Sequence, residues 1–136
     1  MRLSATFLIN VGDVNTWQET SQLQMTEGDA VTVYFQLRDV SVATACDAYK
    51  NPVGRRYMPA AGATVVARID TLNDANVAAL TKTCFQPFAQ DPSIWAFQIL
   101  STDPVSGTKR MKITVTEGLK VTNGIVNSAL LVSPTM

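Results

Sequence analysis

The sequence contains no histidine among its 136 residues. Histidine is the commonest general base, and the usual schemes for activating a serine or cysteine nucleophile depend on it. The sequence also lacks a Gly-x-x-x-x-Gly-Lys phosphate loop and a Gly-x-Gly-x-x-Gly dinucleotide motif. We therefore expect no catalytic residues and no cofactor, and we predict that the protein is not an enzyme.

Charge is also scarce, at 16% of the residues, and eleven basic residues balance eleven acidic ones. A chain with a net charge of zero lacks the basic field that holds nucleic-acid-binding proteins to phosphate. It also lacks the self-repulsion that keeps many proteins monomeric. We expect no nucleic-acid partner and some tendency to self-associate.

No stretch approaches the roughly 20 consecutive apolar residues of a membrane helix. The first ten residues are too short an apolar run for a signal peptide. They alternate instead, with Leu3, Ala5, Phe7 and Ile9 on one side, which predicts a first strand. We expect an unprocessed product made in the cytosol, with no membrane partner.

The two cysteines, Cys46 and Cys84, fit no metal-binding spacing, and no histidine is present to complete a mixed site. We therefore expect no metal. The simplest interpretation is two independent free thiols. The alternative is a disulfide, within the chain or to a neighbouring chain, which requires an oxidising destination such as a particle released from the cell.

Hydrophobic residues make up 46% of the chain, enough for a core in one domain spanning residues 1–136. Short alternating segments separated by turn residues are typical of a β-sandwich or small barrel. We predict an all-β, antiparallel sandwich, immunoglobulin-like or jelly-roll-like, with seven to nine strands. The expected strands cover residues 3–9, 23–25, 31–37, 63–69, 81–88, 93–100, 109–116 and one or two segments within 121–132.

Two dipeptides predict where the chain reverses. Gly28-Asp29 indicates a turn inside a hairpin that runs from about residue 21 to residue 37. Asn123-Gly124 is a hairpin-type dipeptide and predicts a reversal among the final strands. The matching tripeptides at 26–28 and 116–118 indicate shared turn chemistry rather than a repeat.

One long irregular segment, Ser41 to Gly62, interrupts the strands. A loop of this length in a compact domain is usually functional or ordered by a partner. It contains Arg55, Arg56 and Tyr57, and arginine and tyrosine are enriched at protein interfaces. We interpret the three residues as an anchor for a protein contact. The alternatives are a nucleic-acid contact and a solvated loop.

An apolar cluster formed by Phe85, Pro87 and Phe88 precedes the strand that contains Trp95. It predicts a corner of the sandwich or an exposed docking knob, whereas Trp95 alternates with other apolar residues and is expected in the core. The candidate partner-binding residues are therefore Arg55, Arg56, Tyr57, Phe85 and Phe88.

Two rival functions follow from single features. A carboxylate hydrolase needs two acidic residues in one cleft. Most acidic residues instead occupy predicted turns, where we expect them to accept hydrogen bonds from backbone amides. These are Asp29, Asp39, Asp91, Asp103 and Glu117.

A carbohydrate-binding module needs exposed aromatic residues on one sheet face, and Tyr34 is the clear outward-facing strand aromatic.

Three stretches together resemble small virion structural proteins of tailed bacteriophages: residues 26–37, 54–64 and 86–95. The first is also similar to the immunoglobulin-like N-terminal domain of phage upper-baseplate proteins. The resemblance implies a component of the virion, made in the host cytoplasm, that docks onto other virion proteins without catalysis. It implies a place in the tail or baseplate and a homo-oligomer. The alternative within this class is a capsid decoration, or cement, protein.

Overall fold

The computed structural model describes residues 3–10, 17–20, 22–41, 45–46, 52–53, 55–71, 80–103 and 107–133. These residues form twelve strands and no helix. Nine strands have four residues or more, and the three two-residue strands fall in the 41–62 segment that was predicted to be irregular. Within this part of the chain, no helix is long and apolar enough to span a bilayer.

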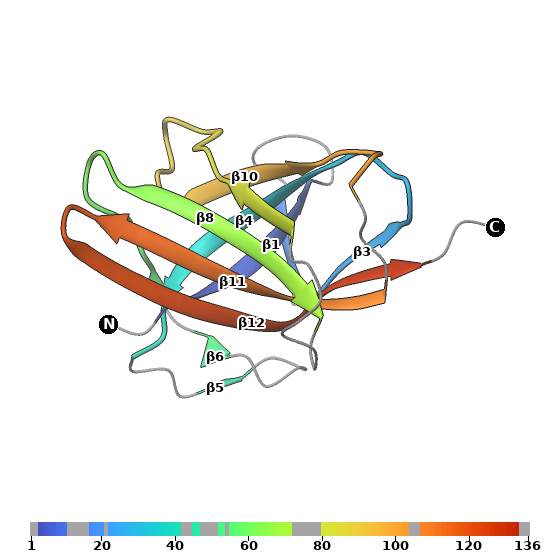
Figure 1. Ribbon diagram of the computed structural model, residues 1–136. Coiled ribbons are helices and arrows are strands. Elements are labelled where there is room, and N and C mark those ends of the chain that lie inside the picture. The colour runs from blue at the N-terminus through green and yellow to red at the C-terminus, as the bar shows by residue number, and fades with distance from the viewer. Residues whose placement is uncertain are drawn as a thin grey trace.

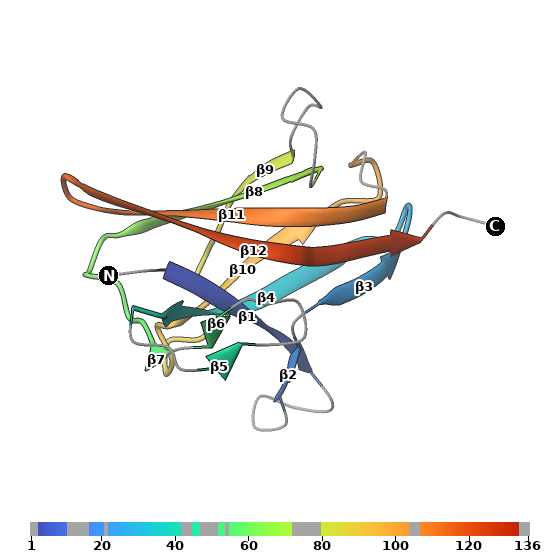
Figure 2. The same ribbon diagram turned by 90° about the horizontal axis from the view of Figure 1, so that it is seen from below.

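Two five-stranded sheets face each other as the layers of a sandwich (Figures 1 and 2), which confirms the predicted fold class. Sheet A contains β10 (Ile94–Ile99), β4 (Val31–Asp39), β1 (Leu3–Asn10) and β2 (Trp17–Thr20) in that order, with β7 (Arg55–Arg56) also paired to β4. Sheet B contains β3 (Leu23–Thr26), β12 (Lys120–Ser133), β11 (Gly107–Glu117), β8 (Thr64–Thr71) and β9 (Leu80–Thr83) in that order. The short pair β5 (Ala45–Cys46) and β6 (Pro52–Val53) lies outside both sheets.

The core lies between the two sheets and is built from the inward side of each alternating strand. Phe7, Phe35 and Phe97 of sheet A are buried, as the sequence predicted. Trp95 joins the same core with an exposed fraction of 5%. Sheet B contributes Val65, Ala67, Ile69, Met111, Ile113, Val115, Val126, Leu130 and Val132.

The predicted hairpin between residues 21 and 37 is wrong. The turn exists, because the backbone N–H of Asp29 donates to the Thr26 carbonyl at 3.1 Å and Gly28 has a φ of 89°. However, β3 pairs in parallel with β12 of sheet B, while β4 belongs to sheet A. The Glu27 N–H donates to the Ser133 carbonyl at 2.7 Å and holds the turn to β12. This pair is an exception to the predicted antiparallel arrangement, which holds for the other strand pairs of the described residues.

The reversal predicted at Asn123-Gly124 is also wrong, because both residues lie inside β12. The chain reverses at Gly118-Leu119, between the paired residues Glu117 and Lys120. Gly118 has a φ of 62°, so the two Thr-Glu-Gly tripeptides do share turn chemistry with a left-handed glycine. Gly124 serves another purpose, since a Cβ atom there would lie 2.3 Å from the Leu3 carbonyl oxygen of β1.

Candidate functional site

The segment that follows β7 is fastened to the end of β4. Arg55 and Arg56 pair with Asp39 and Arg38 of β4, and both arginine side chains are exposed. The next backbone N–H, that of Tyr57, donates to the Leu37 carbonyl at 2.9 Å. The two arginines are thus held on a backbone that the sheet fixes, rather than on a free loop.

Tyr57 and Glu117 clamp this segment to the tip of the β11–β12 hairpin. The Tyr57 hydroxyl donates to Glu117 Oε1 at 2.5 Å, and the Ala60 N–H donates to Oε2 at 2.9 Å. Burial, followed by the bond and the negative charge of Glu117, raises the pKa of Tyr57 from 10.0 to about 12. The same bond, helped by the Ala60 N–H, lowers the pKa of Glu117. Tyr57 is therefore placed as an internal anchor that positions its neighbours.

This clamp predicts a change in the pH dependence of stability. The raised pKa of Tyr57 means that its contribution is complete below pH 10.0 and is lost as the pH rises through about 12. Glu117 has the opposite pH dependence. Its pKa is lowered in the folded protein, so its contribution to stability is lost as the pH falls through the lowered pKa. We expect the Tyr57→Phe protein to lose less stability than the parent on going from pH 10 to 12. Thermal unfolding of both proteins across this range measures the difference, and parallel curves would contradict the clamp.

The second candidate segment, residues 85–93, lies against β10. The Phe85 N–H and carbonyl exchange hydrogen bonds of 2.9 and 2.8 Å with Ala96, and its side chain remains 45% exposed. The Phe88 ring stacks on Tyr34 with the centroids 6.0 Å apart and the planes 16° apart. Phe85 therefore points to solvent while Phe88 covers Tyr34, the outward aromatic of a possible glycan platform.

A polar chain joins the two segments. Gln36 Nε2 donates to Ser93 Oγ at 3.1 Å, and that hydroxyl donates to Asp91 Oδ1 at 2.5 Å. The other oxygen of Asp91 lies 3.7 Å from an Arg56 guanidinium nitrogen. Gln36 and Ser93 are buried, whereas the Arg56 side chain is 66% exposed. The network positions the 85–93 segment beside β7 and reaches the surface at Arg56.

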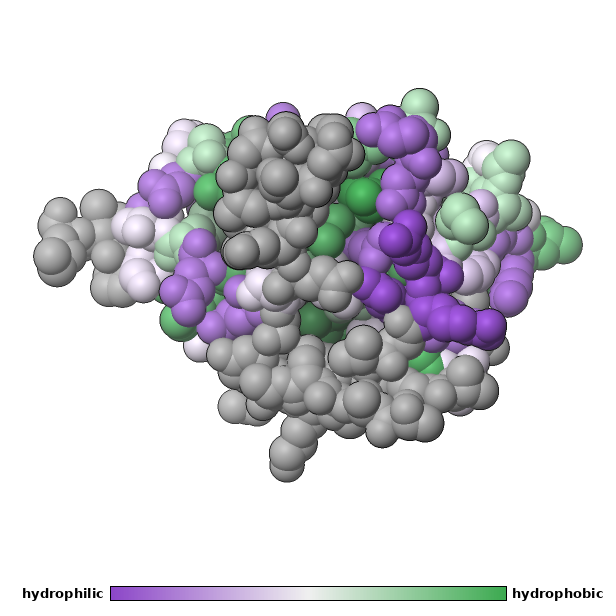
Figure 3. All heavy atoms as spheres, turned by 180° about the vertical axis from the view of Figure 1, so that it is seen from behind, coloured by the Kyte–Doolittle hydropathy of each residue, from purple (hydrophilic) through white to green (hydrophobic). Residues whose placement is uncertain are grey.

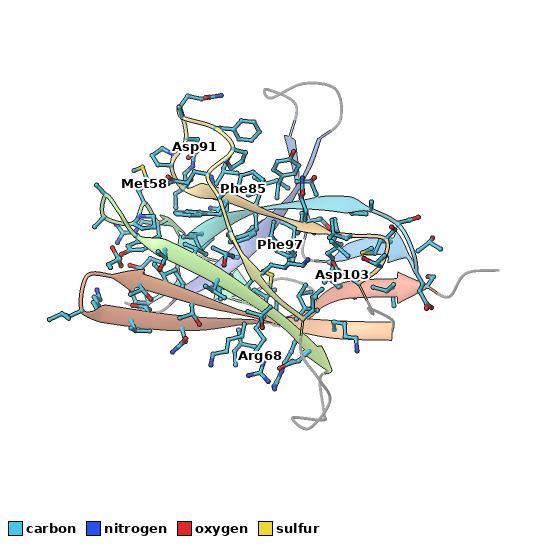
Figure 4. The ribbon with its side chains drawn as sticks, turned by 45° about the horizontal axis from the view of Figure 1, so that its top comes forward. Met58, Arg68, Phe85, Asp91, Phe97 and Asp103 are labelled. Carbon is cyan, nitrogen blue, oxygen red and sulfur yellow. The ribbon has the colours of Figure 1, made fainter. Side chains whose placement is uncertain are left out.

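The Arg56–Asp91 pair joins the two segments at one end of the sandwich, and we call their exposed residues together with Phe88 the aromatic–basic corner. Figure 4 shows Met58, Phe85 and Asp91 at the same end of the sandwich, away from Asp103. The sheet A side of the molecule carries a band of hydrophilic side chains on the half away from the C-terminus (Figure 3). The corner consists of Arg55, Arg56, Met58, Phe85 and Phe88.

Met58 is the residue that sequence reasoning missed. It is 61% exposed, more than Phe85 at 45%. The alternation of side chains after β7 could have indicated it. Tyr57 points inward to Glu117, so the next side chain, Met58, points outward. Of the five candidates named from the sequence, Arg55, Arg56 and Phe85 are exposed, while Tyr57 and Phe88 are half-buried supports.

The acidic turn residues have the predicted role. Each accepts a hydrogen bond of 2.7–3.2 Å from a backbone N–H: Asp29 from Thr26, Asp39 from Ser41, Asp91 from Ser93, Asp103 from Leu100 and Glu117 from Ala60. Lys82 also binds Asp103 at 2.9 Å and, with the Leu100 amide, lowers the pKa of that carboxyl. In the part of the chain described, no group of three or more acidic, cysteine or histidine side chains is arranged to hold a metal ion.

Cys84 is a free thiol that is 8% exposed. Burial raises its pKa from 9.0 to about 12, so the reactive thiolate is scarce at neutral pH. Cys46 belongs to β5, but its side chain lies outside the described residues. Because Cys84 is a free thiol, the alternative of a Cys46–Cys84 disulfide within the chain is not formed in this structure. A disulfide between Cys46 and a neighbouring chain stays a prediction.

Comparisons with known proteins give a fold likeness only. No protein-family model and no curated protein sequence matches the chain. The chain is similar in backbone to an endo-β-1,4-mannanase from Thermotoga petrophila, with a TM-score of 0.48 and 9% sequence identity. The similarity covers 99% of this chain and 20% of the mannanase, so the chain spans about a fifth of that protein. A likeness of this degree says nothing of what this chain binds.

Proposed function

We propose that this protein is a non-catalytic structural component of a tailed-phage particle that docks onto other virion subunits through the aromatic–basic corner. The observation that carries the proposal is that Met58, Phe85 and the two arginines are exposed on two segments that backbone hydrogen bonds fix and the Arg56–Asp91 pair joins. Such a surface binds with little ordering cost, because its backbone is already in place.

The corner favours a partner segment that combines apolar side chains with carboxylates. Met58 and Phe85 offer polarisable and aromatic area, which dominates protein contacts once it is desolvated. The Arg56–Asp91 pair is separated by 3.7 Å and its arginine is 66% exposed, so it stabilises the free protein little. A carboxylate of the partner can therefore replace Asp91 as the neighbour of Arg56.

The placement in a virion rests on the sequence resemblance in residues 26–37, 54–64 and 86–95. Residues 54–64 and 86–95 are the two segments that the structure joins through Arg56 and Asp91, so the resemblance is concentrated at the corner. Within this class we favour a tail or baseplate component over a capsid decoration protein. A homo-oligomer is part of the same proposal.

Binding to separated phage heads and tails tests the proposal. We expect the purified protein to co-sediment with tails and the double variant Met58→Ser, Phe85→Ser to bind at least about tenfold more weakly, as loss of a hot spot does. Leu100→Ser is the matched control, because Leu100 is 50% exposed and bonds to the Asp103 turn, away from the corner. Equal binding by all three proteins would reject the corner, and binding to heads alone would favour the decoration role.

A carbohydrate-binding module makes a different prediction for the same variants. Tyr34 is half-buried beneath Phe88 at 6.0 Å, so among the aromatic side chains that the structure describes Phe85 is the exposed one able to stack on a sugar ring. A binding screen against soluble polysaccharides distinguishes the two functions. Affinity for a polysaccharide that Phe85→Ser abolishes, together with no binding to heads or tails, would replace our proposal.

A further inference from the structure

The long strand β12 has an open edge. It pairs with β11 at residues 120–126 and 130–132, but on its other side β3 pairs only with residues 130–133. Among the residues that the structure describes, no strand pairs with the outer edge of residues 120–129. Figure 1 shows β12 as the border of the front sheet, with β3 only near the end closer to the C-terminus.

The other borders of the two sheets are short or covered. The strands β2, β3 and β9 have four residues each, and β10 is bridged by Phe85 on its outer side. Short or covered edges are the usual protection of a sheet against pairing with another chain. The open part of β12 contains no proline, and Lys120 is its single charged residue. A β-bulge interrupts the ladder between Val126 and Leu130, so residues 120–126 are the regular open stretch available for pairing.

The hairpin geometry determines which backbone groups face outward. Glu117 and Lys120 flank a two-residue loop, so they form a hydrogen-bonded pair of the ladder. Hydrogen-bonded and non-bonded pairs then alternate along an antiparallel ladder. The N–H and carbonyl groups of Val121, Asn123 and Ile125 therefore point away from β11, toward the open edge.

The side chains of the same residues lie on the outer face of sheet B. Val121 is 57% exposed and Ile125 is 49% exposed. The residues on either side of Ile125, Gly124 and Val126, are buried. The Asn123 amide oxygen accepts a hydrogen bond of 2.7 Å from the Thr114 hydroxyl of β11. The edge thus presents an apolar, polar, apolar sequence of side chains that is symmetric about Asn123.

We propose that the edge of β12 pairs with the same edge of a second copy of this chain, antiparallel and about a twofold axis at Asn123. This register places Val121 of each copy opposite Ile125 of the other and joins two B sheets into one. It is self-complementary, as a twofold interface must be. Asn123 then opposes its own counterpart. A shift by two residues keeps the hydrogen bonds but places Val121 opposite Asn123, and so loses both apolar pairs.

The electrostatics of the chain permit this pairing. The net charge is zero, so two copies do not repel each other over long distances. We commit to a second copy as the partner because the strand is symmetric about Asn123, so its own sequence in reverse supplies both apolar pairs. The proposal deepens the homo-oligomer part of the proposed function and uses no residue of the aromatic–basic corner. Loss of pairing and loss of binding to phage tails are therefore separate results.

Sedimentation of the full chain and two variants tests the register. We expect the parent to have an even copy number and Val121→Lys to dissociate that pairing, raising the dimer dissociation constant about tenfold or more. The double variant Val121→Glu, Ile125→Lys restores the pairing, because it places opposite charges across the axis. The two positions lie four residues apart on one strand, too far apart for the rescue to occur within one chain.

A backbone variant separates edge pairing from contact by side chains. Asn123→Pro removes an N–H that β11 does not use, so the monomer folds but the partner loses a hydrogen bond on each side of the axis. Asn123→Ala keeps that N–H and is the matched control. We expect dissociation for proline and pairing for alanine. A monomeric parent at all concentrations, an odd copy number, or a double variant that fails to re-associate would overturn the proposal.

Discussion

Replacing Phe35 by alanine is expected to lower the free energy of unfolding by roughly 3–5 kcal/mol. Phe35 has no exposed surface and occupies the centre of sheet A, paired with Phe7 of β1 on one side and Trp95 of β10 on the other. Its ring centroid lies 6.1 Å from that of Phe97 at an angle of 55°. Truncation removes an aromatic ring from a site whose neighbours are all held by the sheet, so the cavity cannot collapse.

Equilibrium unfolding in urea measures this loss. Gln98→Ala is the matched control on the same sheet, because Gln98 is exposed and follows Phe97 on β10. We expect the control to change stability by less than about 0.5 kcal/mol. A loss below about 1 kcal/mol for Phe35→Ala would mean that the inward side of β4 is assigned wrongly.

Replacing Gly124 by valine is expected to lower stability by roughly 2–3 kcal/mol or more. Valine favours strands, so propensity alone predicts a gain at this position inside β12. The new Cβ would, however, lie 2.3 Å from the carbonyl oxygen and 2.8 Å from the carbonyl carbon of Leu3. Because these are backbone atoms of β1, the two sheets must separate locally to accept the side chain.

Gly118→Asn is the control that distinguishes this clash from the general cost of losing a glycine. Gly118 has a φ of 62° and open space around its Cβ position, and asparagine tolerates that conformation. We expect the Gly118→Asn protein to unfold within about 1 kcal/mol of the parent. Similar losses for the two variants would show that the contact between Gly124 and β1 is not the cause.

The strands could be predicted because the pleat gives the sequence a period of two. In β4 and β10 the buried side is the apolar side at Val33, Phe35 and Phe97, as predicted. The strand with which each strand pairs could not be predicted in this way, because turn chemistry acts over only four residues. The turn at Gly28 reverses the chain as expected, yet the strand before it is placed in sheet B by Leu130 and its neighbours, a hundred residues away in the chain.

The candidate site was predictable in its residue types and not in its roles. Arginine, tyrosine and phenylalanine indicated two segments as candidates, but only the fold shows that these segments meet, with Arg56 3.7 Å from Asp91. The anchoring of Tyr57 depends on Glu117, sixty residues later. Met58 became visible as a surface residue only when that anchor fixed the side to which its neighbour points.

Quantitative mass spectrometry of purified phage particles tests the central claim most directly. The account predicts that this chain is present in intact particles at a fixed copy number, with the symmetry of a tail or baseplate, and that the Met58→Ser, Phe85→Ser variant is depleted from them. A copy number that follows the capsid lattice would move the protein to the shell. Absence from the particles, while the protein is abundant in infected cells, would contradict the structural role.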